Sequence, residues 1–149
     1  MKNKFESNRK RQAAKLSILL LISVITITIG ISGTVLGQTD VAASDLPGSG
    51  TSSDPYQISN VSELQAMEDD LTAHYELVSD IDASTTSDWT NSTGVKVGFD
   101  PVGNSSDKFT GTFDGNGYKV SNLTINRTTE EYVGLFGRVG GDGVIKNTG

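Results

Sequence analysis

The sequence contains no cysteine and a single histidine, His74. Without cysteine the chain has no disulfides, with which small exported domains commonly compensate for a thin core, and no cysteine nucleophile. One histidine cannot form a His-Glu-x-x-His zinc motif. A serine triad would have to use His74, although the chain has no Gly-x-Ser-x-Gly motif. The sequence therefore predicts no active site, and we expect a non-catalytic chain.

Basic residues are scarce after residue 43. Six of the 12 Lys and Arg residues lie there, against sixteen of the 18 Asp and Glu residues, so this part carries a net formal charge of −10. Such a balance argues against nucleic acid and anionic membrane surfaces as partners, since both attract clustered Lys and Arg. It indicates a soluble surface, with calcium binding by some of the acids as an alternative.

A long uncharged run lies near the N-terminus. Residues 1–15 carry six basic residues and one acid, and Leu16–Gly37 contains no charged residue. A basic flank, an apolar run and then small residues are typical of a cleaved secretory signal or of a retained signal-anchor. Both alternatives predict a secreted or cell-surface protein that contacts the membrane only through Leu16–Gly37. We assign residues 1–43 to this segment, 44–55 to a Gly/Ser/Pro linker and 56–149 to the folded part.

The folded part is predicted to consist of short strands and one helix. The helix begins at Asn60–Ser62, where Ser62 and Gln65 fit a capping box, and ends near Thr72–His74. Alternating apolar residues bounded by Gly, Asn and Asp turns predict the strands. The expected strands are residues 56–58, 74–82, 99–104, 109–113, 118–125, 132–136 and 144–146.

The glycine-rich stretch from Phe109 to Gly149 states one pattern twice. Gly111-x-Phe113 recurs as Gly134-x-Phe136, and Val120-x-Asn122 recurs at nearly the same offset as Ile145-x-Asn147. A period in the twenties with glycine at the turns indicates a stacked repeat structure. Because the second copy is incomplete at Gly149, we expect a fragment of a longer ladder.

The order of several short motifs resembles that of bacterial and archaeal surface proteins with GLUG motifs. The resemblance extends from Gly48 to Gly149 and implies a right-handed parallel β-helix, with the helix and first strands capping its N-terminal end. It also implies adhesin-like proteins or non-catalytic regions of immunoglobulin A1 peptidases. The motifs are Asp54-Pro55-Tyr56-Gln57-Ile58, Tyr75-x-Leu77-x-x-Asp80-Ile81-Asp82, Pro101-Val102-Gly103, Phe109-x-Gly111-x-Phe113-Asp114-Gly115-Asn116-Gly117-Tyr118 and Gly134-Leu135-Phe136-Gly137.

These observations predict an all-β fold: an incomplete right-handed parallel β-helix with one N-terminal capping α-helix, preceded by a hydrophobic signal or anchor helix. The predicted function is that of an exported, glycosylated, structural or adhesive cell-surface protein, with glycans or proteins as ligands. The alternative is the non-catalytic N-terminal region of a larger surface hydrolase, a peptidase or a carbohydrate-active enzyme, whose active site lies beyond residue 149.

Five Asn-x-Ser/Thr sequons are candidate glycosylation sites. The asparagine of the first also fits the helix cap. Asn122 and Asn147 have a competing role, because stacked asparagines can hydrogen-bond one another between neighbouring turns of a ladder. The five sequon asparagines are Asn60, Asn91, Asn104, Asn122 and Asn126.

Two acidic patterns invite a metal hypothesis. The Asp114–Gly117 turn fails both frames of the EF-hand loop, so we interpret its Asp-Gly and Asn-Gly pairs as turn formers. Asp80 and Asp82 share a strand face but lack a further carboxylate partner, which favours a turn or a solvated edge. We therefore expect no cofactor, with calcium only as an alternative. The glycines expected to have structural roles in turns are Gly115, Gly117, Gly134 and Gly137.

Overall fold

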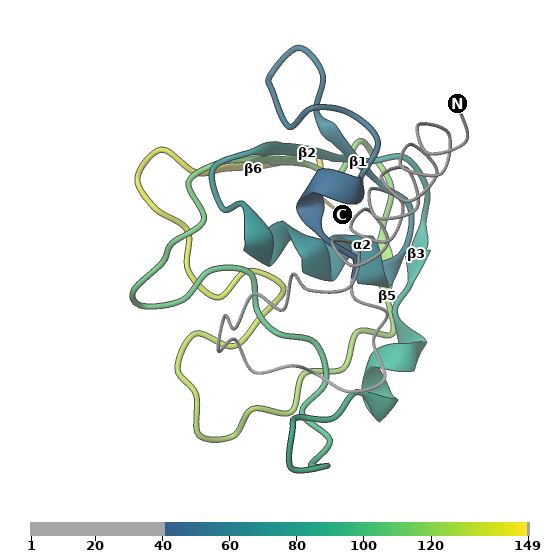
Figure 1. Ribbon diagram of the computed structural model, residues 1–149, viewed down its shortest axis with the longest axis vertical. Coiled ribbons are helices and arrows are strands. Elements are labelled where there is room, and N and C mark those ends of the chain that lie inside the picture. The colour runs from purple at the N-terminus through teal and green to yellow at the C-terminus, as the bar shows by residue number, and fades with distance from the viewer. Residues whose placement is uncertain (1–40, 149) are drawn as a thin grey trace, which may run out of the picture. The chain divides into compact units, whose positions relative to one another are not determined.

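The computed structural model describes residues 41–148 of the chain (Figure 1). The predicted signal or anchor segment, Leu16–Gly37, lies outside the described residues. Across 41–148, every helix is too short or too polar to cross a membrane.

Within residues 41–148, six short strands form two sheets, and every strand pair in both sheets is parallel. The larger sheet has the order β1-β2-β4-β6 and the smaller one pairs β3 with β5. Helix α2 lies beneath the larger sheet in the view of Figure 1. The strands are β1 (Tyr56–Ile58), β2 (His74–Leu77), β3 (Ile81–Asp82), β4 (Thr112–Asp114), β5 (Val120–Ser121) and β6 (Val144–Lys146).

The register of the larger sheet aligns four apolar residues. Tyr56 pairs with Tyr75, Tyr75 with Phe113, and Phe113 with Ile145. Tyr75 and Phe113 are each 1% exposed, as expected where directly opposite side chains share a buried face. The Tyr56 and Tyr75 rings lie 5.6 Å apart, and the Phe113 ring meets that of Phe136 edge-on at 5.2 Å. Alternation of apolar and polar residues therefore fixes which face each strand buries.

The helix is much shorter than the predicted segment that ends near Thr72–His74. Helix α2 (Val61–Gln65) continues as the 3₁₀-helix η2 (Ala66–Asp69) and does not reach Thr72. The Asn60 side chain accepts hydrogen bonds from the backbone N–H groups of Ser62 and Glu63, so the N-cap is Asn60 and the predicted Ser62 cap is wrong. Asp70 then adopts an extended conformation that ends the helical segment.

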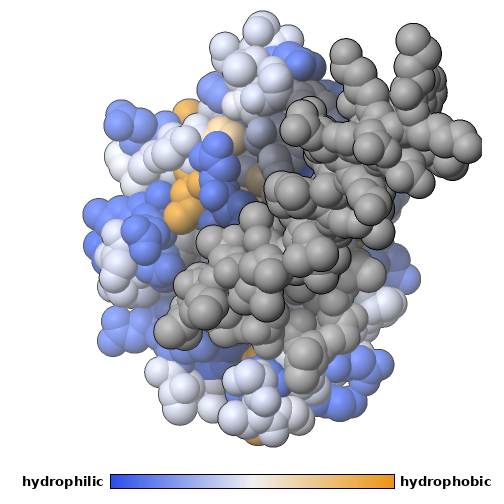
Figure 2. Space-filling view, viewed as in Figure 1, coloured by the Kyte–Doolittle hydropathy of each residue, from blue (hydrophilic) through white to orange (hydrophobic). Residues whose placement is uncertain are grey.

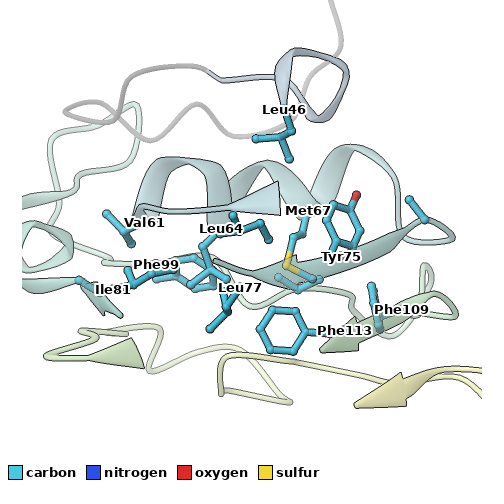
Figure 3. Packing of buried hydrophobic residues seen from close by; sticks show 14 of the residues in the cluster. Leu46, Val61, Leu64, Met67, Tyr75, Leu77, Ile81, Phe99, Phe109 and Phe113 are labelled. Carbon is cyan, nitrogen blue, oxygen red and sulfur yellow. The ribbon is translucent and has the colours of Figure 1, made fainter. Parts of the chain in front are cut away.

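Side chains from α2, η2, β2 and β4 meet in one core (Figure 3). Leu64 of α2 and Met67 of η2 are fully buried in this core. The buried Gln65 amide donates to the Asp100 carbonyl at 2.9 Å and accepts from the Asp100 N–H at 2.8 Å. These two hydrogen bonds connect the helix to the loop before Val102. Loss of either would leave part of the buried amide unpaired and lower the stability of the fold.

Residues 44–55, the predicted linker, pack on the sheet. The 3₁₀-helix η1 (Ala43–Asp45) leads into Leu46, which is 5% exposed and joins the core. Pro47 accepts a hydrogen bond from the Gln57 N–H of β1, and Gly50 accepts one from the His74 N–H of β2. This segment is therefore part of the folded unit.

The predicted right-handed β-helix with a leading hydrophobic helix is wrong. The strands are parallel, but residues 41–148 form two separate open sheets and a short helix, a mixed fold without a continuous solenoid. The aligned positions Tyr56, Tyr75, Phe113 and Ile145 are unevenly spaced along the chain, and none of their spacings equals the apparent repeat period. Phe136 pairs with Val102 and Phe113 pairs with Ile145, so corresponding positions of the two sequence copies are not paired with each other.

Other predicted strands are shorter in the structure, because some of their residues have backbone φ angles outside the β region. The predicted strand 74–82 divides into β2 and β3, and of 118–125 only β5 remains because Asn122 has φ +57°. The segment 132–136 contributes one isolated bridge, and Tyr132 at its start has φ +64°. The third 3₁₀-helix, η3 (Ser84–Asp88), precedes the buried Trp89. Strands β1 and β6 have the predicted bounds.

The buried Phe113 side chain on β4 is expected to contribute strongly to the stability of the fold. Phe113→Ala should lower the free energy of unfolding by about 3–5 kcal/mol, because a buried ring is removed and a cavity remains. Tyr118→Ala, at a residue 37% exposed, should change it by less than about 0.5 kcal/mol. Urea unfolding followed by the fluorescence of Trp89 measures both, and equal effects would contradict the assigned core.

Candidate functional site

Asp82 and Asn122 form a side-chain clasp at the end of the smaller sheet. The Asn122 amide donates to the Asp82 carboxylate at 3.0 Å, and the Ser84 N–H donates to the same oxygen at 3.0 Å. Asp82 pairs with Ser121 in the strand register, so Asn122 lies one residue past its partner. The amide of Asn122 and the donors of Ser84 lower the pKa of Asp82, since all of them bond the ionised form.

Asp114 and Asn147 repeat this clasp at the end of the larger sheet. The Asn147 amide donates to Asp114 at 2.8 Å, and the Asn116 N–H donates to the same oxygen at 2.9 Å. Asp114 pairs with Lys146, whose ammonium lies 3.0 Å from the other carboxylate oxygen. The amide of Asn147, followed by Lys146 and Asn116, lowers the pKa of Asp114 from 3.8 to about 2.

The two clasps differ from the predicted asparagine ladder. Asn122 and Asn147 do have the same role, and both adopt left-handed backbone, with φ +57° and +53°. Each bonds an aspartate of the neighbouring strand in its sheet and not another asparagine. The repeated apolar-x-Asn pattern was visible in the sequence. Its aspartate partners, 40 and 33 residues earlier, were not.

The acidic pair Asp80 and Asp82 is divided between two structural contacts. The Asp80 carboxylate accepts the Lys119 N–H at 3.1 Å, while Asp82 belongs to the clasp. Among residues 41–148, no group of three or more His, Asp or Glu side chains is arranged to hold a metal ion. His74, the predicted helix-end histidine, is the first residue of β2, paired with Thr112.

Arg127 forms a second polar cluster that the sequence did not predict. Its side chain is 10% exposed, and its guanidinium lies 2.9 Å from both the Asp100 and Glu130 carboxylates. Its Nε also donates to the Phe99 carbonyl at 3.2 Å. Burial raises the pKa of Asp100, and the neighbouring Arg127 opposes that change. Because Asp100 also binds Gln65, this cluster connects the 127–130 loop to helix α2.

The four predicted turn glycines differ in what they do. Gly117, with φ +79°, follows Asn116 with φ +51°, which confirms this pair as a turn. At Gly115 and Gly137 a Cβ atom would lie 2.5 and 2.3 Å from a backbone oxygen of a neighbouring segment, so only glycine fits. A Cβ atom at Gly134 would be 3.2 Å from the nearest backbone oxygen, a tight but less restrictive contact.

The sequon asparagines fall into two groups according to how the side-chain amide is used. The Asn122 nitrogen donates to Asp82, and the Asn126 nitrogen donates to the Lys96 carbonyl at 2.9 Å. Asn91 and Asn104 instead use the side-chain oxygen, which accepts backbone N–H groups of the following residues. In the first group the side-chain nitrogen is engaged in a hydrogen bond, and in the second group the side-chain oxygen is engaged.

Asn60 belongs to neither group. Its oxygen caps helix α2, and its nitrogen makes a long 3.5 Å contact with the Ser59 hydroxyl. The Glu63 carboxylate in turn accepts the Ser59 N–H at 2.7 Å. Asn60 is exposed and caps helix α2. Capping is one of the two roles that the sequence predicts for it, and glycosylation is the other.

Two known proteins are similar to this chain over 67% of its length. Halomucin of Haloquadratum walsbyi is 42% identical over 106 residues, and a protein of Evansella cellulosilytica named as a Gly-rich membrane protein is 35% identical over 102 residues. The matched region is 1% of halomucin and 11% of the membrane protein, so the chain spans a small part of either relative. No family model and no solved structure matches the chain.

The two clasps connect neighbouring strands, and their polar groups are engaged in the hydrogen bonds that do so. The carboxylates singled out by the sequence, Asp80, Asp82 and Asp114, each accept hydrogen bonds from a neighbouring strand or turn. The geometry therefore favours structural roles for these residues.

Removing one clasp asparagine should change the titration of its own aspartate only. Asn147→Ala should raise the pKa of Asp114 from about 2 toward 3.8, while Lys146 keeps it from returning fully. Asn122→Ala should raise the pKa of Asp82 and leave Asp114 unchanged. Carboxyl carbon chemical shifts followed by NMR against pH measure both, and a change at the wrong aspartate would exclude the clasps.

The sign of the pH effect on stability follows from the same shift. The folded-state pKa of Asp114 lies below 3.8, so its ionised form stabilises the fold above that pH, and the contribution disappears as the pH falls through about 2. Asn147→Ala should therefore destabilise the chain at neutral pH and have a smaller effect below a pH of about 2. Urea unfolding at both pH values measures the difference, and an equal loss at each would contradict it.

Proposed function

We propose that this chain is a surface or membrane-associated protein whose described part is a structural module without catalytic activity. The observation that carries the proposal is the use of its conspicuous aspartates in strand-end hydrogen bonds. A general acid or base must reach its substrate. Asp82 and Asp114 are instead hydrogen-bonded by the amides of Asn122 and Asn147, each of which directly follows the neighbouring strand of the sheet. A carboxylate kept ionised by such donors is also a poor proton donor near neutral pH.

The charge distribution supports an exposed location. Residues 44–95 contain ten acidic residues and no Lys or Arg, and the part visible in Figure 2 is mostly hydrophilic with small separate apolar areas. Such a surface is strongly hydrated and repels other acidic surfaces. Similarity to proteins named halomucin and Gly-rich membrane protein favours the same location.

The more specific roles, adhesion to glycan or protein ligands and membership of the GLUG-motif proteins, remain predictions from the sequence. Their support is the order of motifs that ends in Gly134-Leu135-Phe136-Gly137. N-glycosylation belongs to the same proposal.

Surface location can be tested by labelling lysines in intact cells with a membrane-impermeant amine reagent. Lys96, Lys108 and Lys119 are exposed and should be labelled before lysis. Peptide mapping separates them from the lysines before residue 16, which should be protected if the segment 16–37 is retained as an anchor. Labelling of Lys96 only after lysis would contradict an exported protein, and a cytoplasmic marker controls for leakage.

Glycan occupancy should follow the use of the amide nitrogen, because that atom carries the sugar. In a host that glycosylates Asn-x-Ser/Thr sites, Asn91 and Asn104 should be occupied more than Asn122 and Asn126. Mass spectrometry after enzymatic deglycosylation in ¹⁸O water measures each site. Preferential occupancy of Asn122 would contradict this order and also the clasp in which its nitrogen is engaged.

A further inference from the structure

Asn116 is the one asparagine in the sequence that is followed by glycine. The backbone nitrogen of the next residue can attack an asparagine side chain, and a Cβ atom on that residue hinders the attack. At Gly117 there is no Cβ atom, and one built there would meet nothing within 4 Å. The residues that follow the other asparagines in 41–148 all carry a Cβ atom and are Val61, Ser92, Ser105, Leu123, Arg127 and Thr148.

The folded turn keeps the two reacting atoms of this pair apart. Asn116 and Gly117 have φ +51° and +79°, and the Tyr118 N–H donates to the Gly115 carbonyl at 2.8 Å, which defines a type I′ turn. The first central residue of such a turn has ψ of about +30°, which places its Cβ and the next nitrogen on nearly opposite sides of the Cα–C bond. Ring closure requires both atoms on the same side. The closed turn is therefore far from the geometry of attack.

Hydrogen bonds to neighbouring segments hold the turn closed. The Asn116 N–H donates to the Asp114 carboxylate at 2.9 Å, and the Asn116 amide donates to the Leu77 carbonyl at 3.4 Å. The Gly117 N–H, which belongs to the attacking nitrogen, donates to the Asn147 carbonyl at 3.4 Å. Because Asn147 also clasps Asp114 with its side chain, we expect the clasp to stabilise the closed turn.

We propose that Asn116 is a deamidation site that the fold controls: its amide is lost when the 115–118 turn opens and is protected while the turn is closed. In the open turn the Gly117 nitrogen gives up its proton to solvent base and forms a bond to the side-chain carbonyl carbon of Asn116. The bond from that carbon to the amide nitrogen breaks, and ammonia leaves. Water then opens the cyclic imide at either of its carbonyl carbons, which gives aspartate or isoaspartate.

Neither product restores the original turn. Aspartate places carboxylate oxygens where the Asn116 amide donates to the Leu77 carbonyl, and it adds a charge beside Asp114, which is ionised at neutral pH. Isoaspartate inserts an extra methylene into the main chain and so changes the backbone between β4 and β5. The reaction therefore makes a transient opening of the turn permanent.

The test follows loss of the amide in the full chain, kept in mild detergent at a mildly alkaline pH. Trypsin cleaves after Lys108 and Lys119 and releases residues 109–119, in which Asn116 is the one asparagine. Mass spectrometry separates the amide from the acid, with freshly purified chain as the control for loss during digestion. The folded chain should react at least about tenfold more slowly than a synthetic peptide of residues 109–119, because the turn must first open.

Two matched variants show whether the turn controls the rate. Asn147→Ala removes the clasp and should speed the loss by up to about tenfold, the effect of one charged hydrogen bond on turn opening. Asn91→Ala removes side-chain hydrogen bonds in the 91–95 loop and should leave the rate unchanged. Trp89 fluorescence verifies that both variants are folded. The proposal is overturned if another asparagine reacts first, if folded chain and peptide react equally fast, or if the two variants have equal effects.

Discussion

The parallel pairing of β2 with β4, which places Tyr75 directly beside Phe113, is the interaction on which the rest of the structure depends. These residues are far apart in the sequence, so their pairing closes a long loop at an entropic cost that burial of both rings must offset. Once that register is set, Phe136 lies against Phe113, and helix α2 covers the same core. Each strand is only two to four residues long, and strands of this length are stable only as parts of a packed core.

The same register explains why the conspicuous polar residues lie where they do. Asp82 and Asp114 are the last residues of their strands, and the next strand in each sheet continues one residue further to an asparagine with left-handed backbone. Carboxylate and amide therefore meet at the strand ends, where unpaired backbone groups would otherwise need water. The aspartates that suggested a metal or acid–base site therefore form hydrogen bonds that hold neighbouring strands together, which supports the structural role that we propose.

Sequence reasoning found the local features and missed the long-range ones. Strands β1 and β6 follow from the alternation of apolar and polar residues, and the turn at Asn116-Gly117 follows from turn chemistry. Both signals are local. The β-helix prediction failed because the period of an apparent sequence repeat was taken as the stacking distance, whereas the aligned strands are separated by unequal lengths of chain that do not match it. Asp114–Asn147 and Arg127–Asp100 were likewise invisible, since nothing in one sequence says which distant residues share an edge.

The register itself can be measured, because the chain has no cysteine of its own. His74 and Thr112 are directly paired, so a variant with cysteine at both positions should form an intramolecular disulfide under mild oxidation. Cysteines at positions 74 and 114 are offset by two residues along the strands, beyond the reach of about 7 Å between Cα atoms, and should stay reduced. Equal or preferential crosslinking of the 74 and 114 pair would contradict the register and with it the placement of both clasps.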